Sequence, residues 1–237
     1  MKTPRMILFD YGQTLADERP FDGVAGTRAV LAHAVANPHG HTAEEIQAEA
    51  DAINHAIGRF DPARKHLFQI EVPNHMFTAY LYGSMGIELA LTPAEIDRTF
   101  WYAASPARPT EGFPALLDFL HAKGVRTGVI SNITYDPAVV RERIDTLLPG
   151  HHFEFIIATS GYMFRKPNRR IFDLALVKAG LPAEDVWYCG DNPRVDVDGA
   201  RAAGLTPVHY VGATDQPAPA ENAIVIRHWD ELKELLA

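Results

Sequence analysis

The chain has 237 residues, 47% of them hydrophobic and 22% charged, and this composition excludes a disordered, collagen-like or membrane-embedded protein. Its net charge of -8 argues against nucleic acid or an anionic membrane as a partner. The single cysteine, Cys189, excludes an internal disulfide framework and fits a reducing compartment. The first apolar run, Met6 to Phe9, is too short for a signal peptide, so we expect a cytoplasmic protein.

Five short runs rich in Val, Ile, Phe and Tyr are typical of buried parallel strands. They are Met6 to Phe9, Thr127 to Ile130, Phe153 to Ala158, Val186 to Cys189, and Pro207 to Val211. Helical patterns separate them, and two of these end at Gly124 and Gly180, where glycine is the usual stop signal. A last strand near Ile224 and a short helix from Asp230 should follow. The alternation predicts an α/β fold with a doubly wound parallel sheet.

One long insert interrupts this alternation between Leu15 and about Pro106, where the pattern is helical and no strand is expected. Thr42 with Glu45 is a capping-box signature, and Thr92, Pro93 and Glu95 form a second one. The insert leaves after the first strand and returns before the second. We therefore expect it over the carboxyl edge of the sheet, where open α/β sheets bind ligands.

Polar residues follow four of the predicted strands. Asp10, Ser131 and Asp191 each end a strand, and Lys166 follows the third strand by several residues. The carboxyl ends of parallel strands share one edge, so these side chains should converge. Two carboxylates, a hydroxyl and an ammonium group suit phosphoryl chemistry with a divalent cation. Asp10 would attack, Asp10 and Asp191 would hold Mg²⁺, and Ser131 and Lys166 would neutralise the phosphoryl oxygens.

Four ordered motifs give the chain a resemblance to the haloacid dehalogenase superfamily of hydrolases. Phe9 to Leu15 resembles the nucleophile loop of the family, and Val129 to Asn132 resembles its second motif. The lysine motif is matched by Arg165 to Asn168 with Ile171 and Phe172. The acidic metal motif is matched by Gly190 and Asp191, followed by Asp196, Gly199 and Ala200. The resemblance implies a Rossmann-like core formed by residues 1–15 and 107–237, with a helical cap at 16–106.

The same resemblance assigns roles to individual residues. Asp10, Ser131 and Lys166 would be catalytic, and Ser131, Asn132 and Lys166 would bind the substrate. The metal ligands would be Asp10, Asp191 and the main-chain carbonyl of Gly12, while Asp196 would support them from behind. This assignment predicts Mg²⁺ as the cofactor.

Gly12 departs from the family pattern. The phosphatases of the family carry a second Asp at this position, which acts as general acid and base. Because that chemistry contributes about 10²–10⁴-fold, substrates with poor leaving groups should react slowly here unless another acid substitutes. Asp17, Glu18 and the histidines of the cap are candidates, although none has matching spacing. Gln13 also differs, since the family usually has Gly there.

Two other reactions stay open, because each is catalysed by family members that lack this second Asp. Members that cleave carbon–phosphorus bonds use a cap lysine as a Schiff base, and Lys65 is the only lysine of the insert, although its polar surroundings indicate a surface residue. Dehalogenating members need no metal and usually have a weakened acidic motif. The presence of both Asp191 and Asp196 favours phosphate chemistry.

Several residues also have simpler interpretations. Ser131 and Asn132 could only cap the following helix. Cys189 should be an inert thiol in a buried strand. The histidines show no HExxH spacing, which disfavours a zinc site, and His66 and His75 are kept as candidates for substrate contact.

The sequence thus favours a Mg²⁺-dependent phosphatase that forms an aspartyl phosphate at Asp10 and acts on a small metabolite with a good leaving group, such as an acyl or aryl phosphate. A phosphate-binding or regulatory protein with little turnover is the alternative from another class. The expected partner is a small phosphorylated molecule, and both a monomer and a homodimer remain open.

Overall fold

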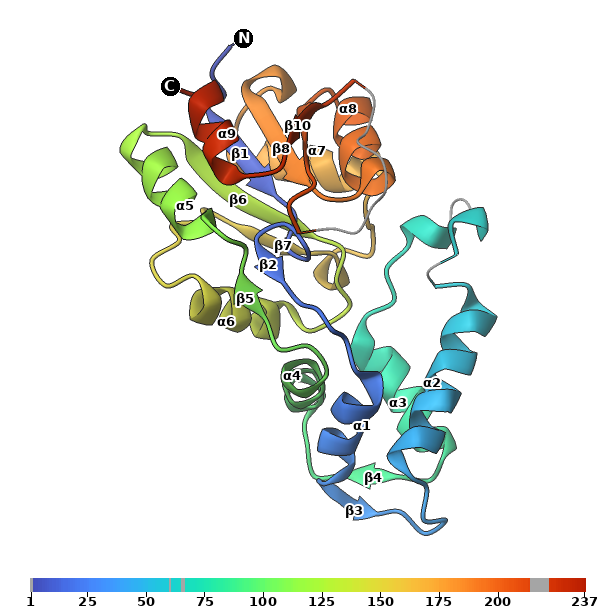
Figure 1. Cartoon of the computed structure of the whole chain (residues 1–237). Helices are drawn as coiled ribbons and strands as arrows, with labels where there is room; N and C mark the ends of the chain where they lie inside the picture. Colours follow the sequence, from blue (N-terminus) through green and yellow to red (C-terminus); the bar gives the residue numbers. More distant parts are fainter. Residues whose placement is uncertain (1, 60, 65–66, 214–221) are drawn as a thin grey trace.

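The computed structural model describes residues 2–59, 61–64, 67–213 and 222–237. Within them, one six-stranded sheet has the order β10-β9-β8-β1-β6-β7, and every neighbouring pair is parallel (Figure 1). The strands are β1 (Met6–Phe9), β6 (Arg126–Ser131), β7 (Ile156–Ala158), β8 (Val186–Gly190), β9 (Thr206–Tyr210) and β10 (Ile224–Ile226). The α/β prediction is confirmed, although β7 begins three residues later than the apolar run from Phe153 suggests.

Helices cover both faces of the sheet, which explains why its strands are continuously apolar. On one face lie α5 (Phe113–Ala122), α6 (Pro137–Leu147) and α9 (Trp229–Leu235); on the other lie α7 (Arg169–Ala179) and α8 (Gly199–Ala203). Strand β1 serves both cores, since Ile7 and Phe9 belong to the first and Met6 and Leu8 to the second. Cys189 is fully buried in the first core, as expected for a structural thiol.

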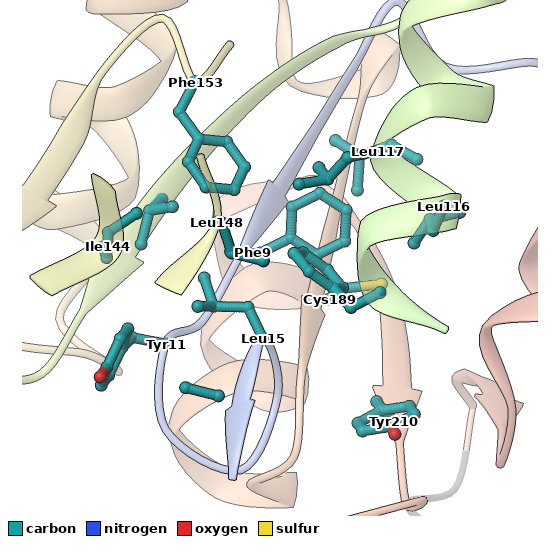
Figure 2. Packing of buried hydrophobic residues seen from close by; sticks show 14 of the residues in the cluster. Phe9, Tyr11, Leu15, Leu116, Leu117, Ile144, Leu148, Phe153, Cys189 and Tyr210 are labelled. Carbon is teal, nitrogen blue, oxygen red and sulfur yellow. The ribbon is translucent and has the colours of Figure 1, made fainter. Parts of the chain in front are cut away.

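Phe9 anchors the strand that leads to Asp10. Its ring makes edge contacts with Phe113 at 5.1 Å and Trp229 at 6.0 Å between centroids. Figure 2 shows Phe9 in the middle of the cluster, between Leu117 of α5 and Ile144 of α6. Aromatic pairs of this kind stabilise by about 0.5–1.5 kcal/mol beyond the burial of their area. The end of β1 is therefore rigidly held.

The insert consists mainly of four helices gathered beside one end of the sheet (Figure 1). They are α1 (Gly23–Leu31), α2 (Ala43–Ile57), α3 (Asn74–Ser84) and α4 (Pro93–Ala104), around a core that includes Val30, Ile46, Leu81 and Ile96. Both predicted capping boxes are present: the hydroxyls of Thr42 and Thr92 accept from the N–H groups of Glu45 and Glu95, whose carboxylates accept in return.

The expectation that the insert contains no strand is wrong. A short antiparallel pair, β3 (Ala34–Ala36) and β4 (Glu88–Leu89), links the end of α1 to the segment before α4. Strands of two or three residues are too short to show an alternating pattern, so periodicity could not reveal them.

Two chain segments join the insert to the sheet as a ribbon. The outgoing strand β2 (Ala16–Asp17) pairs antiparallel with the returning strand β5 (Arg108–Pro109). Beyond the ribbon, the hydroxyl of Thr110 donates to the carbonyl of Thr14 at 2.7 Å and accepts from Nε1 of Trp229 at 3.0 Å. Both segments are thereby fixed to α9.

Buried polar contacts hold the insert against the core. The N–H of Asn74 donates to the carbonyl of Thr134 at 2.8 Å. The carboxylate of Asp97 accepts from the N–H of Asp136 at 2.7 Å, and that of Glu71 accepts from the hydroxyl of Thr159 at 2.7 Å.

The remaining helical elements are short. They are η1 (Pro62–Arg64), η2 (Leu67–Gln69), η3 (Thr159–Gly161), η4 (Ala183–Asp185) and the π-helical η5 (Pro193–Asp198). Across the described part of the chain, every helix is too short or too polar to cross a lipid bilayer.

Candidate active site

The ends of β1, β6 and β8 lie side by side and bring the predicted site residues together. Phe9 is in register with Val129 on one side and Cys189 on the other, so Asp10 follows a strand that lies between the strands leading to Ser131 and Asp191. A recess of about 220 Å³ opens here. Its lining residues are Asp10, Tyr11, Gly12, Glu18, Phe21, Trp101, Ser105, Ser131, Asn132, Ile133 and Tyr135.

Lys166 connects the carboxylates of this site. Its Nζ lies 2.8 Å from Oδ1 of Asp10, 2.6 Å from Oδ1 of Asp196 and 2.6 Å from the hydroxyl of Tyr188. The side chain is fully buried, and a buried ammonium group is stable only when it is paired and hydrogen-bonded. Burial opposes its charge, yet the carboxylates of Asp10 and Asp196 raise the pKa of Lys166 above its usual value. The two carboxylates therefore favour the charged form of Lys166 beside Asp10.

Asn132 positions the segment that carries Lys166. Its Oδ1 accepts from the main-chain N–H of Lys166 at 2.7 Å, and its Nδ2 donates to the carbonyl of the same residue at 2.9 Å. The alternative that Ser131 and Asn132 cap the next helix is wrong, because α6 begins at Pro137 and its N-cap is Asp136.

Three carboxylates lie close enough to share one cation. Ligand atoms of Asp10, Asp191 and Asp196 all lie within 4.8 Å of one another. Burial and the charge of Asp196 raise the pKa of Asp10 to about 6, although Lys166 acts in the opposite direction. Burial, Asp196 and Asp10 together raise the pKa of Asp191 to about 8. This crowding of negative charge, built from hard oxygen donors, fits a divalent ion such as Mg²⁺.

The oxygens of Asp196 are already engaged by the protein. Oδ1 contacts Lys166, and Oδ2 accepts from the N–H of Asn192 at 2.9 Å. A Cβ atom at Gly190 would lie 2.3 Å from Cγ of Asp196, so only glycine allows the carboxylate to pack against this strand. Both oxygens of Asp196 are therefore held by groups of the protein.

The nucleophile loop contains a strained residue. Gln13 has φ of 53°, in the left-handed region where glycine is favoured. Its N–H donates to the carbonyl of Ala16 at 2.7 Å, which closes the turn, but its buried Oε1 has no hydrogen-bond partner in the described structure. This conformation explains why glycine would suit the position.

Glu18, one of the proposed substitutes for the missing acid, lines the recess. A Cβ atom placed on Gly12 would lie 3.7 Å from Oε2 of Glu18. Burial raises the pKa of Glu18 above its usual value, against the opposing charge of Arg143. Asp17, by contrast, forms ion pairs of 3.1 Å with both Arg19 and Arg108 and does not line the recess.

A polar network that sequence reasoning missed holds Glu18 in place. Its Oε1 accepts from Nε1 of Trp101 at 2.9 Å, the hydroxyl of Tyr11 at 3.2 Å and the guanidinium of Arg143 at 3.3 Å. Arg143 is itself buried, donates to the Tyr11 hydroxyl at 2.8 Å and lies over the ring of Trp101. These residues come from three distant segments, so no local motif could reveal them.

Three further candidates are Lys65, His66 and His75 of the insert. Lys65 and His66 lie outside the described residues. His75 is exposed at the start of α3 and does not line the recess. Within the described chain, the only cluster of potential metal ligands is the carboxylate group of Asp10, Asp191 and Asp196, and it contains no histidine.

Comparisons with known proteins agree with this geometry. The haloacid dehalogenase-like hydrolase family matches residues 4–204. A phosphoglycolate phosphatase from Pseudomonas savastanoi pv. phaseolicola is 23% identical over 99% of this chain and 79% of its own. The structure of a 2-haloacid dehalogenase from Pseudomonas syringae pv. tomato superposes with a TM-score of 0.68 at 20% identity, over 98% of this chain and 97% of that one.

A higher local identity is found with a phosphoserine phosphatase from Thermus thermophilus, which is 32% identical over 94 residues. That match spans 40% of this chain and only 37% of the phosphatase. The family match over most of the chain, together with the six-stranded parallel sheet and the residues at its carboxyl edge, shows that this protein belongs to the haloacid dehalogenase-like hydrolases.

Proposed function

We propose that this hydrolase is a Mg²⁺-dependent phosphatase of small phosphorylated metabolites, with Asp10 as its nucleophile. The observation that carries the proposal is the position of Lys166, whose buried ammonium group lies between the carboxylates of Asp10 and Asp196. Bound at Asp10, Asp191 and the carbonyl of Gly12, Mg²⁺ would supply positive charge to the phosphoryl oxygens.

Each residue of the site has its own role in the proposed reaction. A carboxylate oxygen of Asp10 attacks phosphorus, and the bond between phosphorus and the leaving oxygen breaks, which produces an aspartyl phosphate and the free leaving group. Lys166 and the hydroxyl of Ser131 neutralise charge on the phosphoryl oxygens. Water then attacks phosphorus, which releases phosphate and restores the carboxylate. Asn132 keeps Lys166 in place throughout.

Gly12 sets the expected substrate preference. It has no side chain to protonate the leaving oxygen, so acyl and aryl phosphates should react faster than sugar phosphates. Glu18 is the carboxylate nearest to the vacant position and is the described residue best placed to substitute. The three-carboxylate cluster favours phosphatase chemistry over metal-free dehalogenation.

A phosphate-binding protein with little turnover is the second candidate, because the site would bind phosphate whether or not Gly12 limits the rate. Phosphate release from acetyl phosphate, p-nitrophenyl phosphate and a hexose phosphate, with and without Mg²⁺, separates the two. We expect Mg²⁺-dependent release from the first two substrates and its loss in Asp10→Asn. Phosphate binding without release above that blank would support the binding protein. Metal-independent halide release from a 2-haloacid would instead support a dehalogenase.

A further inference from the structure

A second hollow lies beside the recess at Asp10. This cap cavity, of about 210 Å³, lies among α1, α2, α3 and α4 and reaches the loop after β6. Phe21 and Tyr135 line both the cap cavity and the recess. The two hollows therefore adjoin, and a molecule with its phosphoryl group at Asp10 would carry its leaving group towards the cavity.

Aromatic side chains form a continuous wall along this route. Tyr135 stacks on Trp101 with 4.7 Å between ring centroids and contacts Phe100 at 6.4 Å. Phe100 in turn contacts Phe21 at 6.2 Å, and Phe77 adds a further ring deeper in the cap. Flat apolar groups gain contact with such rings and also gain free energy when they leave water.

The charges around the cavity do not favour an anion. Arg59 is the one cation among the described lining residues, and its guanidinium donates to the carbonyl of Val72 and to Oδ1 of Asn54. It also lies over the ring of Phe77 and 4.0 Å from the fully buried carboxylate of Glu71. Its guanidinium is thus engaged inside the protein, where it shares the carboxylate of Glu71 with Arg165.

The other charged lining residue is acidic. Asp51 faces the cavity and accepts from Nε2 of Gln47 at 2.9 Å. A carboxylate on the bound molecule would lose its hydration and meet Asp51, while the guanidinium of Arg59 is already engaged by Val72, Asn54 and Glu71. An uncharged leaving group pays no such cost.

Resting on the phosphatase activity proposed above, we propose that the cap cavity receives the leaving group of the substrate and selects an uncharged aryl or arylalkyl group over one that carries a carboxylate. The selection differs from what phosphoglycolate or phosphoserine would require, since both carry a carboxylate beside the phosphate. It agrees with Gly12, because aryl oxides leave readily without protonation.

Three phosphonates test the selection without turnover: methylphosphonate, benzylphosphonate and phosphonoacetate, each titrated calorimetrically into the Mg²⁺-loaded protein. We expect benzylphosphonate to bind about tenfold or more tightly than methylphosphonate, because its ring is buried. Phosphonoacetate should bind no better than methylphosphonate. Equal or tighter binding of phosphonoacetate relative to benzylphosphonate would overturn the proposal, as would failure of all three to bind.

Substitutions on one helix locate the effect. Ala50 of α2 is 6% exposed and lines the cavity, so Ala50→Phe should reduce benzylphosphonate affinity to that of methylphosphonate. Ala52→Phe, at an exposed position of the same helix, should change neither affinity. Thr78→Met narrows the cavity from α3 with a flexible side chain and provides a second variant if Ala50→Phe does not fold.

Retention of the benzyl preference in a folded cavity variant would refute the cap cavity as the binding site. Acetyl phosphate places no ring in the cavity, so its hydrolysis reports on the phosphatase proposal alone. A protein that shows the phosphonate selectivity but no acetyl phosphate hydrolysis would retain the cavity assignment and refute the phosphatase.

Discussion

Oε2 of Glu18 lies 3.7 Å from the point that a Cβ atom on Gly12 would occupy. A carboxylate from the start of the insert thus approaches the place where related phosphatases carry their second Asp. The donors of its network, from Trp101, Tyr11 and Arg143, reach Oε1 instead. The dependence of the hydrolysis rate on the leaving group shows whether this carboxylate transfers a proton.

Gly12→Asp should restore the missing acid. The space for a side chain is open, since the nearest atom is a carboxylate oxygen at ordinary contact distance. We expect hydrolysis of hexose phosphate to rise by about tenfold or more, because its leaving oxygen needs protonation, and acetyl phosphate hydrolysis to change little. Steady-state kcat/KM for both substrates measures the effect.

Glu18→Gln is the matched control for that substitution. If the unmodified protein already hydrolyses hexose phosphate as fast as acetyl phosphate, a selective loss of the hexose activity in Glu18→Gln would identify Glu18 as the acid. An equal loss of activity on both substrates would show that Glu18 only positions neighbouring groups.

Gly190→Ala should disrupt the site by displacing the carboxylate of Asp196. The added methyl group would overlap the Asp196 carboxylate, which must then leave its contact with Lys166. We expect phosphatase activity to fall by about 100-fold, on the scale of losing one group that stabilises developing charge. Gly83→Ala is the control, because a Cβ there meets nothing within 4 Å. Activity of Gly190→Ala close to that of the control would contradict the supporting role of Asp196.

Gln13→Gly should stabilise the fold. Relief of the left-handed conformation at φ 53° favours the variant by about 1 kcal/mol, which corresponds to a Tm increase of about 2–4 °C for a chain of this size. Gln13→Ala separates the causes, since it removes the unpartnered Oε1 and keeps the strain. A larger gain in Gln13→Ala than in Gln13→Gly would show that the amide, and not the backbone, is the source.

Two carboxylates should differ in how much their ion pairs contribute to stability. Glu71 is fully buried between Arg59 and Arg165, at 4.0 and 3.6 Å, so Glu71→Gln should lower the free energy of unfolding by about 3–5 kcal/mol. Glu142 pairs with Arg98 where both side chains are 41% exposed, and Glu142→Gln should cost less than about 1 kcal/mol. Urea denaturation measures both, and similar losses would contradict this difference.

The sequence predicted the sheet and the meeting of Asp10, Ser131 and Asp191, because the ends of parallel strands share an edge whatever the loops do. It also predicted the capping boxes at Thr42 and Thr92, whose contacts lie within four residues. It could not predict the partners of Glu18, since Trp101 and Arg143 reach it through tertiary packing alone. For the same reason the residues that line the cap cavity became apparent only from the arrangement of the helices.

The attachment of Thr110 to both Thr14 and Trp229 has a mechanical consequence. The two segments that lead to the insert are pinned at the same point, so a load on the insert would be carried by β2, β5 and α9 before it reached the turn after Asp10. The C-terminal helix, through Trp229, is the fixed point of this attachment. The position of Asp10 is therefore tied to the C-terminal helix as well as to the sheet.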